Sequence, residues 1–158
     1  MEMIEFKNLC AKSFGNYGLI KRKKGYFMEN DDFILSIFLQ KSNFSMSYYI
    51  NVGYSVKGYN MIIPDIKDET DQDFGYRIRF PYKDGTEVKY GYALKLKDFD
   101  TVEIEPYFDK AFEEWILPIF HGGKKEAISN INIHFGSPKN FLCLRKGLYE
   151  YLLEEAAK

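Results

Sequence analysis

Two histidines and two cysteines are the side chains of this chain best suited to acid–base chemistry, nucleophilic attack or metal binding. His121 and His134 each end a predicted helix, where the helix dipole favours a cation. Neither belongs to the His-x-x-x-His or Cys-x-x-Cys spacing of a zinc site. Cys10 falls on the apolar side of a predicted helix, which favours core packing. We therefore predict no catalytic residue, no metal and no cofactor.

An enzyme with an unrecognised site stays open as an alternative. No Gly-x-Ser-x-Gly elbow and no glycine-rich phosphate loop occurs in the sequence. A deep pocket that brought His121 or His134 together with a carboxylate would favour this alternative.

An acidic loop over residues 65–73 partly matches a calcium-binding pattern. Residues 71–75 read Asp-Gln-Asp-Phe-Gly, but the third acidic position and the distant bidentate glutamate are missing. We predict a solvated loop, whose role the sequence leaves open.

Polar side chains gather on residues 32–54, which read as two strands joined by a short polar loop. Strand alternation places Ser36, Gln40, Tyr49 and Asn51 on one face and apolar residues on the other. Arg77 and Arg79 point the same way if their strand joins the sheet with Tyr76 and Ile78 inward, and Lys89, Lys95 and Lys97 extend the basic side. Amide and hydroxyl groups beside arginine suit a carboxylate, a phosphate or a peptide backbone.

The alternative is that this polar face only meets water, as one face of an antiparallel sheet normally does. Ser42, in the triplet Gln40-Lys41-Ser42, serves equally well to fix the turn or to bind. The candidate binding residues are therefore Ser36, Gln40, Ser42, Tyr49, Asn51, Arg77 and Arg79.

The apolar alternation also predicts how the two strands pair. Placing Gln40 opposite Ser47 sets apolar against apolar throughout. The predicted pairs are Leu39 with Tyr48, Ile37 with Ile50, Leu35 with Val52, and Phe33 with Tyr54.

The remaining elements follow from periodicity and turn chemistry. We predict a helix over 3–17, strands over 25–29, 75–80 and 88–96, and an edge segment at 61–63. The inward side of the strand over 88–96 carries Val88, Tyr90, Tyr92, Leu94 and Leu96. A helix begins near Pro106 and ends at Gly122-Gly123, a weaker one spans 124–134, and Ser137-Pro138 starts the last, with Phe141 and Leu144 inward.

These elements predict one α+β domain over residues 1–158. Its single antiparallel sheet has about five strands, with the N-terminal and C-terminal helices packed on one face. Aromatic residues make up 18% of the chain, so we expect a core rich in rings.

Two stretches resemble the bacterial domain of unknown function 4304 family. One is the hairpin signature, Leu39-Gln40-Lys41-Ser42 followed by residues 48–53, Tyr-Tyr-Ile-Asn-Val-Gly. The other is the lead-in over residues 17–25, Tyr-Gly-Leu-Ile-Lys-Arg-Lys-Lys-Gly, and Trp115 sits where the family's C-terminal helix carries a tryptophan. The resemblance is specific over residues 1–54 and looser beyond, and it implies a single cytoplasmic α+β domain without implying a reaction.

Composition limits the kinds of partner. A formal net charge of −1 gives no overall attraction to nucleic acid or to an anionic membrane. No apolar run approaches the roughly 20 residues that span a bilayer, and no signal peptide is visible at the N-terminus. With two cysteines, a reduced cytoplasmic protein is the expected reading.

Our leading functional hypothesis is a non-catalytic binding domain, of an immunity or regulatory type, that recognises a protein partner or an anionic small ligand. The alternative is single-stranded nucleic-acid binding by aromatic and basic side chains of the sheet.

Overall fold

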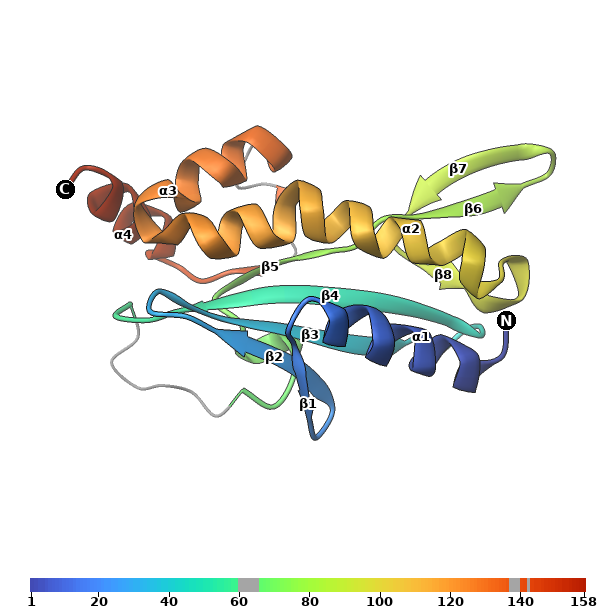
Figure 1. Cartoon of the computed structure of the whole chain (residues 1–158). Helices are drawn as coiled ribbons and strands as arrows, with labels where there is room; N and C mark the ends of the chain where they lie inside the picture. Colours follow the sequence, from blue (N-terminus) through green and yellow to red (C-terminus); the bar gives the residue numbers. More distant parts are fainter. Residues whose placement is uncertain (60–65, 137–139, 142) are drawn as a thin grey trace.

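An antiparallel sheet with helices over one face forms the body of the protein, which confirms the predicted α+β class (Figure 1). The computed structural model describes residues 1–59, 66–136, 140–141 and 143–158. The sheet runs in the order β1-β2-β3-β4-β5-β9, and β8 also pairs with β4. These strands are β1 (Ile20–Arg22), β2 (Gly25–Glu29), β3 (Phe33–Lys41), β4 (Ser47–Val56), β5 (Phe74–Arg77), β8 (Leu94–Lys95) and β9 (Cys143–Leu144).

The central pair β3–β4 has the predicted faces but a different register. Phe33, Leu35, Ile50 and Val52 are fully buried, as the alternation requires. Gln40, however, lies opposite Tyr49 and not opposite Ser47, so every predicted pair is shifted by two residues. The reason is a shorter turn, because the Ser42 amide already donates to the Ser47 carbonyl at 2.8 Å. A shift of two leaves each side chain on its own face.

The predicted strands over 75–80 and 88–96 are wrong in extent and partly wrong in burial, because Ile78, Phe80, Leu94 and Leu96 are buried as predicted while three other side chains are not. The expected strand over 75–80 stops at Arg77, and β6 (Phe80–Asp84) and β7 (Glu87–Gly91) form a separate two-stranded ribbon. Figure 1 shows this ribbon projecting beyond the end of the main sheet. Val88, Tyr90 and Tyr92 are about half exposed, at 56%, 55% and 48%. Their alternation is that of a free hairpin and not of a core strand.

Helices cover the apolar face of the sheet. α1 (Met3–Asn16) buries Phe6 and Phe14 against the sheet residues Tyr48 and Tyr26. α2 (Thr101–Ala111) starts five residues before Pro106, because Asp100 caps it by accepting a hydrogen bond from the Glu103 amide. A π-helical turn (Phe112–Ile116) joins α2 to α3 (Leu117–Phe135).

α3 contains the predicted break at Gly122-Gly123, where one helical segment stops and a second one begins. Gly123 has φ 75° and ψ 178°, a backbone conformation that favours glycine. Figure 1 shows the chain reversing at this point, so that the second half of α3 runs back beside the first. Next to the bend, the Asn30 side chain donates a hydrogen bond to the Phe120 carbonyl at 2.8 Å.

Part of the acidic loop covers the polar face of the sheet. Gln72 lies flat over Gly53, where an added Cβ would come within 1.9 Å of its Cδ. Its amide donates to the carbonyl and to the hydroxyl of Ser36, at 3.0 and 2.9 Å. Asp73 is also buried, accepts from the Val56 amide and forms an ion pair with Arg145 at 2.8 Å. The end of this loop is therefore structural and not solvated.

The C-terminal segment differs from the prediction where it is described. The last helix, α4 (Leu148–Ala156), starts later than expected, and Leu144 belongs to β9. The predicted edge segment at 61–63 and the predicted helix start at Ser137-Pro138 lie outside the described residues. Within the described parts of the chain, no helix is long and apolar enough to cross a membrane.

Candidate functional site

Four of the seven candidate residues form one connected cluster on the polar face of the sheet. Arg77 donates to the Asn51 side chain at 2.9 Å and to the Gln40 side chain at 3.0 Å. Asn51 in turn donates to Gln40 at 3.0 Å, and the Arg77 guanidinium lies over the Tyr49 ring at 4.3 Å. The predicted neighbourhood of Arg77, Gln40 and Asn51 is therefore confirmed. Their polar groups are largely engaged with one another.

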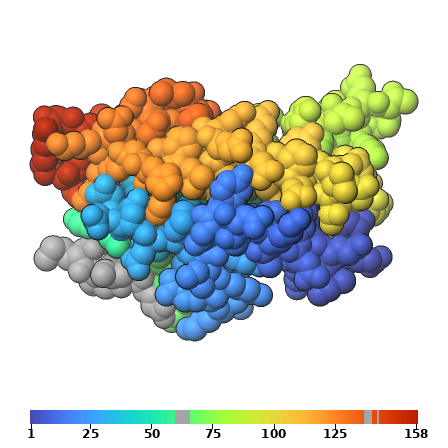
Figure 2. All heavy atoms as spheres, in the orientation of Figure 1, coloured from blue at the N-terminus to red at the C-terminus, as the bar shows by residue number. Residues whose placement is uncertain are grey.

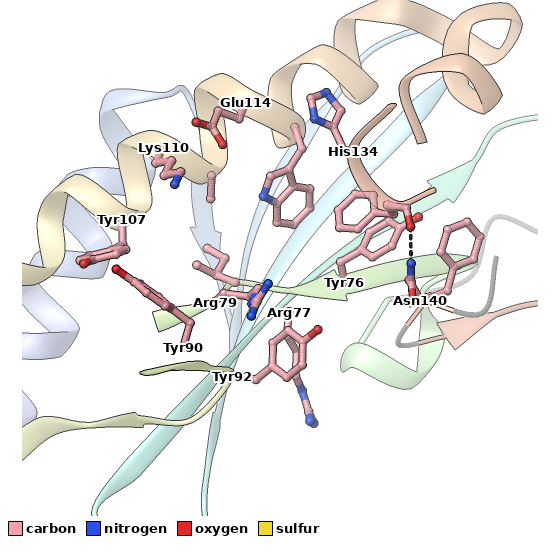
Figure 3. A pocket seen from close by; sticks show the side chains of 15 residues that line it. Tyr76, Arg77, Arg79, Tyr90, Tyr92, Tyr107, Lys110, Glu114, His134 and Asn140 are labelled. Carbon is pink, nitrogen blue, oxygen red and sulfur yellow. Dashed lines mark hydrogen bonds between the residues drawn. The ribbon is translucent and has the colours of Figure 1, made fainter. Parts of the chain in front are cut away.

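The other three candidates lie apart from this cluster. Ser36 is fully buried beneath Gln72, and the Ser42 hydroxyl accepts from the Phe44 amide within the turn. Arg79 follows the end of β5 and does not share the direction of Arg77, because the strand alternation ends at Arg77. Figure 3 shows the two guanidinium groups pointing to different sides, with Arg79 in a cleft.

This cleft has a volume of about 840 Å³ and lies between the β6–β7 ribbon and the helices α2 and α3. One side is formed by Arg79 and by Tyr90 and Tyr92 of the ribbon region (Figure 3). The helical side carries Tyr107 and Lys110. This volume lies within the roughly 300–1,000 Å³ that small-molecule sites typically span.

Packed aromatic rings form one end of the cleft. The Tyr76 ring stacks on Phe135 and meets Trp115 and Phe141 edge-on, with centroid distances of 5.7 and 4.8 Å. Trp115 also meets Phe135 edge-on at 5.2 Å. Phe135 reaches this position because the chain reverses at Gly123. The bend in α3 therefore completes the cleft.

The charge of the cleft is weakly positive. Arg79 and Lys110 are exposed cations, and Glu114 is the single carboxylate among the described residues that line it. Desolvation raises the pKa of Tyr107, and the neighbouring Tyr90 hydroxyl raises it further. Burial likewise raises the pKa of Tyr76. These phenols therefore stay neutral near neutral pH and can donate hydrogen bonds.

His134 and Glu114 both line this cleft, which is the arrangement that favours the enzyme alternative. Figure 3 places both on the helical side. No ion pair joins them within the described part of the chain. Nor does any group of three metal-ligating side chains occur among residues that the structure describes.

Sequence reasoning found Arg79 and His134 but did not group them with Tyr90, Tyr92, Tyr107 or Lys110. Their alternation placed Tyr90 and Tyr92 in the core. The available signal was a hairpin turn, Asp84-Gly85, followed by tyrosines on a strand that also carries charges.

A comparison with protein families places most of the chain in one of them. The family model described as "Domain of unknown function (DUF4304)" matches residues 10–122, which is more than two thirds of the chain. The chain belongs to the DUF4304 family. No curated protein and no solved structure matches it at a significant level.

The DUF4304 match extends well past residues 1–54. It includes the sheet from β1 to β8 and the part of α3 before the bend. The cleft side with Arg79, Tyr90 and Lys110 lies inside the matched range. His134 and Phe135 lie beyond it.

Proposed function

We propose that this DUF4304 chain is a non-catalytic binding domain that takes an anionic small ligand in the cleft between the β6–β7 ribbon and the helices. The observation that carries the proposal is the lining of the cleft. Two exposed cations, Arg79 and Lys110, stand among tyrosine and tryptophan side chains, with Glu114 as the carboxylate opposing them. Cations attract an anion, and the rings supply apolar contact for the rest of the ligand.

The volume favours a small ligand over a protein partner. About 840 Å³ is a typical small-molecule site, whereas a stable protein interface needs a broad surface of roughly 800 Å² on each partner. The polar face of the sheet supports the proposal less well. There, Ser36 and Asn51 are fully buried and hydrogen-bonded within the chain.

We place this activity in the cytoplasm of a bacterium. The two cysteines, Cys10 and Cys143, are both free thiols, which is consistent with a reducing compartment. A regulatory or immunity role remains part of the proposal, with the ligand as its signal.

The chain contains a reporter for this site, because Trp115 is its only tryptophan and lines the cleft. We would titrate the protein with phosphate, citrate and adenosine monophosphate, following Trp115 fluorescence and, in parallel, the heat of binding. Arg79→Gln and Lys110→Gln should each weaken binding about fivefold, since an exposed charge contact contributes about 1 kcal/mol. Lys41→Gln, which removes an exposed lysine outside the cleft, should change nothing.

The proposal fails if none of these anions changes the fluorescence or produces heat. It also fails if Arg79→Gln and Lys110→Gln bind with the affinity of the unmodified chain, as the control Lys41→Gln should. Either result would leave the cleft without a role in anion recognition.

Single-stranded nucleic acid is the second candidate. It is favoured by the exposed rings of Tyr90 and Tyr92 near Arg79, because bases stack on such rings while cations contact the phosphates. A short single-stranded oligonucleotide should then bind more tightly than adenosine monophosphate, with an affinity that falls steeply as salt is raised. Equal affinity at low and moderate salt contradicts this candidate.

A further inference from the structure

The β6–β7 ribbon presents one open strand edge. β6 pairs only with β7, and no other described strand pairs with either of them. Figure 2 shows the ribbon, in light green, standing clear of the remaining surface. An isolated two-stranded ribbon is marginally stable, and its unpaired backbone groups are a template for another strand.

The two edges of the ribbon differ. β6 is held to the body by Phe80, whose buried ring meets Phe108, and by Lys83, which donates to the Asp98 carbonyl at 3.0 Å. Pro81 lies in β6 opposite Tyr90 and has no N–H to offer. The β6 edge is therefore blocked, while β7 is the free edge.

The register determines which β7 groups point outward. Gly85 and Thr86 form a two-residue loop, with Gly85 at φ 64°. In such a hairpin the backbone N–H and C=O groups of the closing pair, Asp84 and Glu87, point toward each other. The backbone N–H and C=O groups of the next pair, Lys83 and Val88, point away from the partner strand, and the two arrangements alternate along the ribbon. Val88 and Tyr90 thus offer their N–H and C=O groups at the free edge. The outward position of Pro81, opposite Tyr90, agrees with this assignment.

If two copies of β7 pair antiparallel about Val88, opposite charges lie across from each other. In an antiparallel pair with a two-fold axis through Val88, Glu87 lies opposite Lys89 of the second copy, and Lys89 lies opposite its Glu87. An axis through Lys89 would set two lysines against each other, which is unfavourable. An axis through Tyr90 would bring the second copy toward α2, where Tyr90 contacts Tyr107 at a centroid distance of 6.4 Å.

We propose that two copies of this chain pair through β7, antiparallel and with Val88 opposite Val88, to form a four-stranded ribbon. The exposed side chains agree with this partner, since Val88 and Tyr90 are 56% and 55% exposed on one face of the ribbon. Pairing would cover part of this apolar surface and satisfy the outward backbone groups of both copies. The inference does not depend on the ligand proposed for the cleft.

The test is sedimentation velocity of the full chain over a wide range of protein concentration. The unmodified chain should show a monomer–dimer equilibrium. Lys89→Glu removes the ion pair that Lys89 forms with Asp84 of its own ribbon at 2.7 Å. It also places glutamate opposite glutamate twice across the axis, and it should raise the dimer dissociation constant on the order of tenfold. Combining it with Glu87→Lys restores opposite charges across the axis and should recover most of the affinity. Lys125→Glu, an exposed charge reversal on α3, is the matched control and should have no effect.

A second variant tests the backbone without altering charge. Val88→Pro removes an outward N–H that β6 does not use, so the hairpin should persist while dimerisation is lost. Circular dichroism and Trp115 fluorescence would verify that each variant is folded. A chain that stays monomeric at every concentration overturns the proposal. So does a dimer that Lys89→Glu and Val88→Pro leave unchanged.

Discussion

Replacing Gly53 by alanine should destabilise the protein strongly, because Gln72 occupies the space above this glycine. A Cβ at Gly53 would lie 1.9 Å from Gln72 Cδ and within 2.3 Å of both heteroatoms of its amide. Gln72 is 1% exposed, so its amide is enclosed by the rest of the chain. The added methyl group must therefore displace the amide or strain the strand.

The cost follows from what Gln72 loses on displacement. Two hydrogen bonds to Ser36, at 3.0 and 2.9 Å, contribute about 1 kcal/mol each, and overpacking of a buried site adds about 1–3 kcal/mol. Because displacement relieves part of the strain, we expect a total loss of about 2–4 kcal/mol in the free energy of unfolding. Urea denaturation followed by circular dichroism measures it.

Two controls separate this packing effect from a general effect of alanine. Gly15→Ala, in α1 and with no atom within 4 Å of the added Cβ, should leave stability unchanged or raise it by up to about 1 kcal/mol. In a Gln72→Ala background, Gly53→Ala should cost less than about 1 kcal/mol, since the clash is gone. An equal cost of Gly53→Ala with and without the Gln72 side chain would refute the reasoning.

Two further predictions concern charged groups on the polar face. Burial raises the pKa of Asp73, so the folded chain keeps the proton of this carboxyl group to a higher pH than the unfolded chain does. The protonated carboxyl group therefore contributes its full stabilisation below about pH 4, and this contribution declines as the pH rises through the pKa of the folded state. Relative to the unmodified chain, Asp73→Asn should therefore gain stability across that rise, and parallel urea titrations at increasing pH that show no such trend would contradict this. Arg77→Ala should cost about 1–3 kcal/mol in urea denaturation, because Gln40 and Asn51 each lose a hydrogen bond and the Tyr49 ring loses its cation. Arg77→Lys should recover little of this loss, since an ammonium lacks the planar fork that reaches both amides; full recovery would show that charge alone suffices.

Local patterns predicted the faces of the central strands, because alternation of side chains needs no knowledge of distant residues. Phe33 and Val52 were assigned to the core on that basis and are fully buried. The register depended on the turn between the strands. The turn is shorter than assumed, because Ser42 and Ser47 already pair. A local pattern therefore determines the face and leaves a two-residue uncertainty in the partner.

The ribbon shows a second limit of periodicity. Tyr90 and Tyr92 recur at every second position as core residues do, but both rings remain about half exposed. Alternation shows that two sides differ and does not show which side is buried. The burial of these rings depends on the break between Arg77 and Phe80, where the strand ends and the chain leaves the main sheet.

The cleft depended on a backbone conformation at one residue. Gly122-Gly123 correctly predicts a break in the helix, but only the torsion angles of Gly123 make that break a reversal. The reversal brings Phe135 to Trp115 from 20 positions along the chain. Gly53 and Gly75 within strands were a usable signal for the Gln72 contact, since glycine in a strand marks a close approach.

The order of elements along the chain has a consequence for synthesis. β1 to β4 lie within the first 56 residues, whereas α2 and α3, which cover much of their apolar face, begin only at Thr101. At about 5–20 residues per second, the strands precede these helices by roughly 2 to 10 seconds. During that interval α1 alone shields the large apolar side chains of β3 and β4. The growing chain therefore exposes the apolar face of this sheet until α2 and α3 have been made.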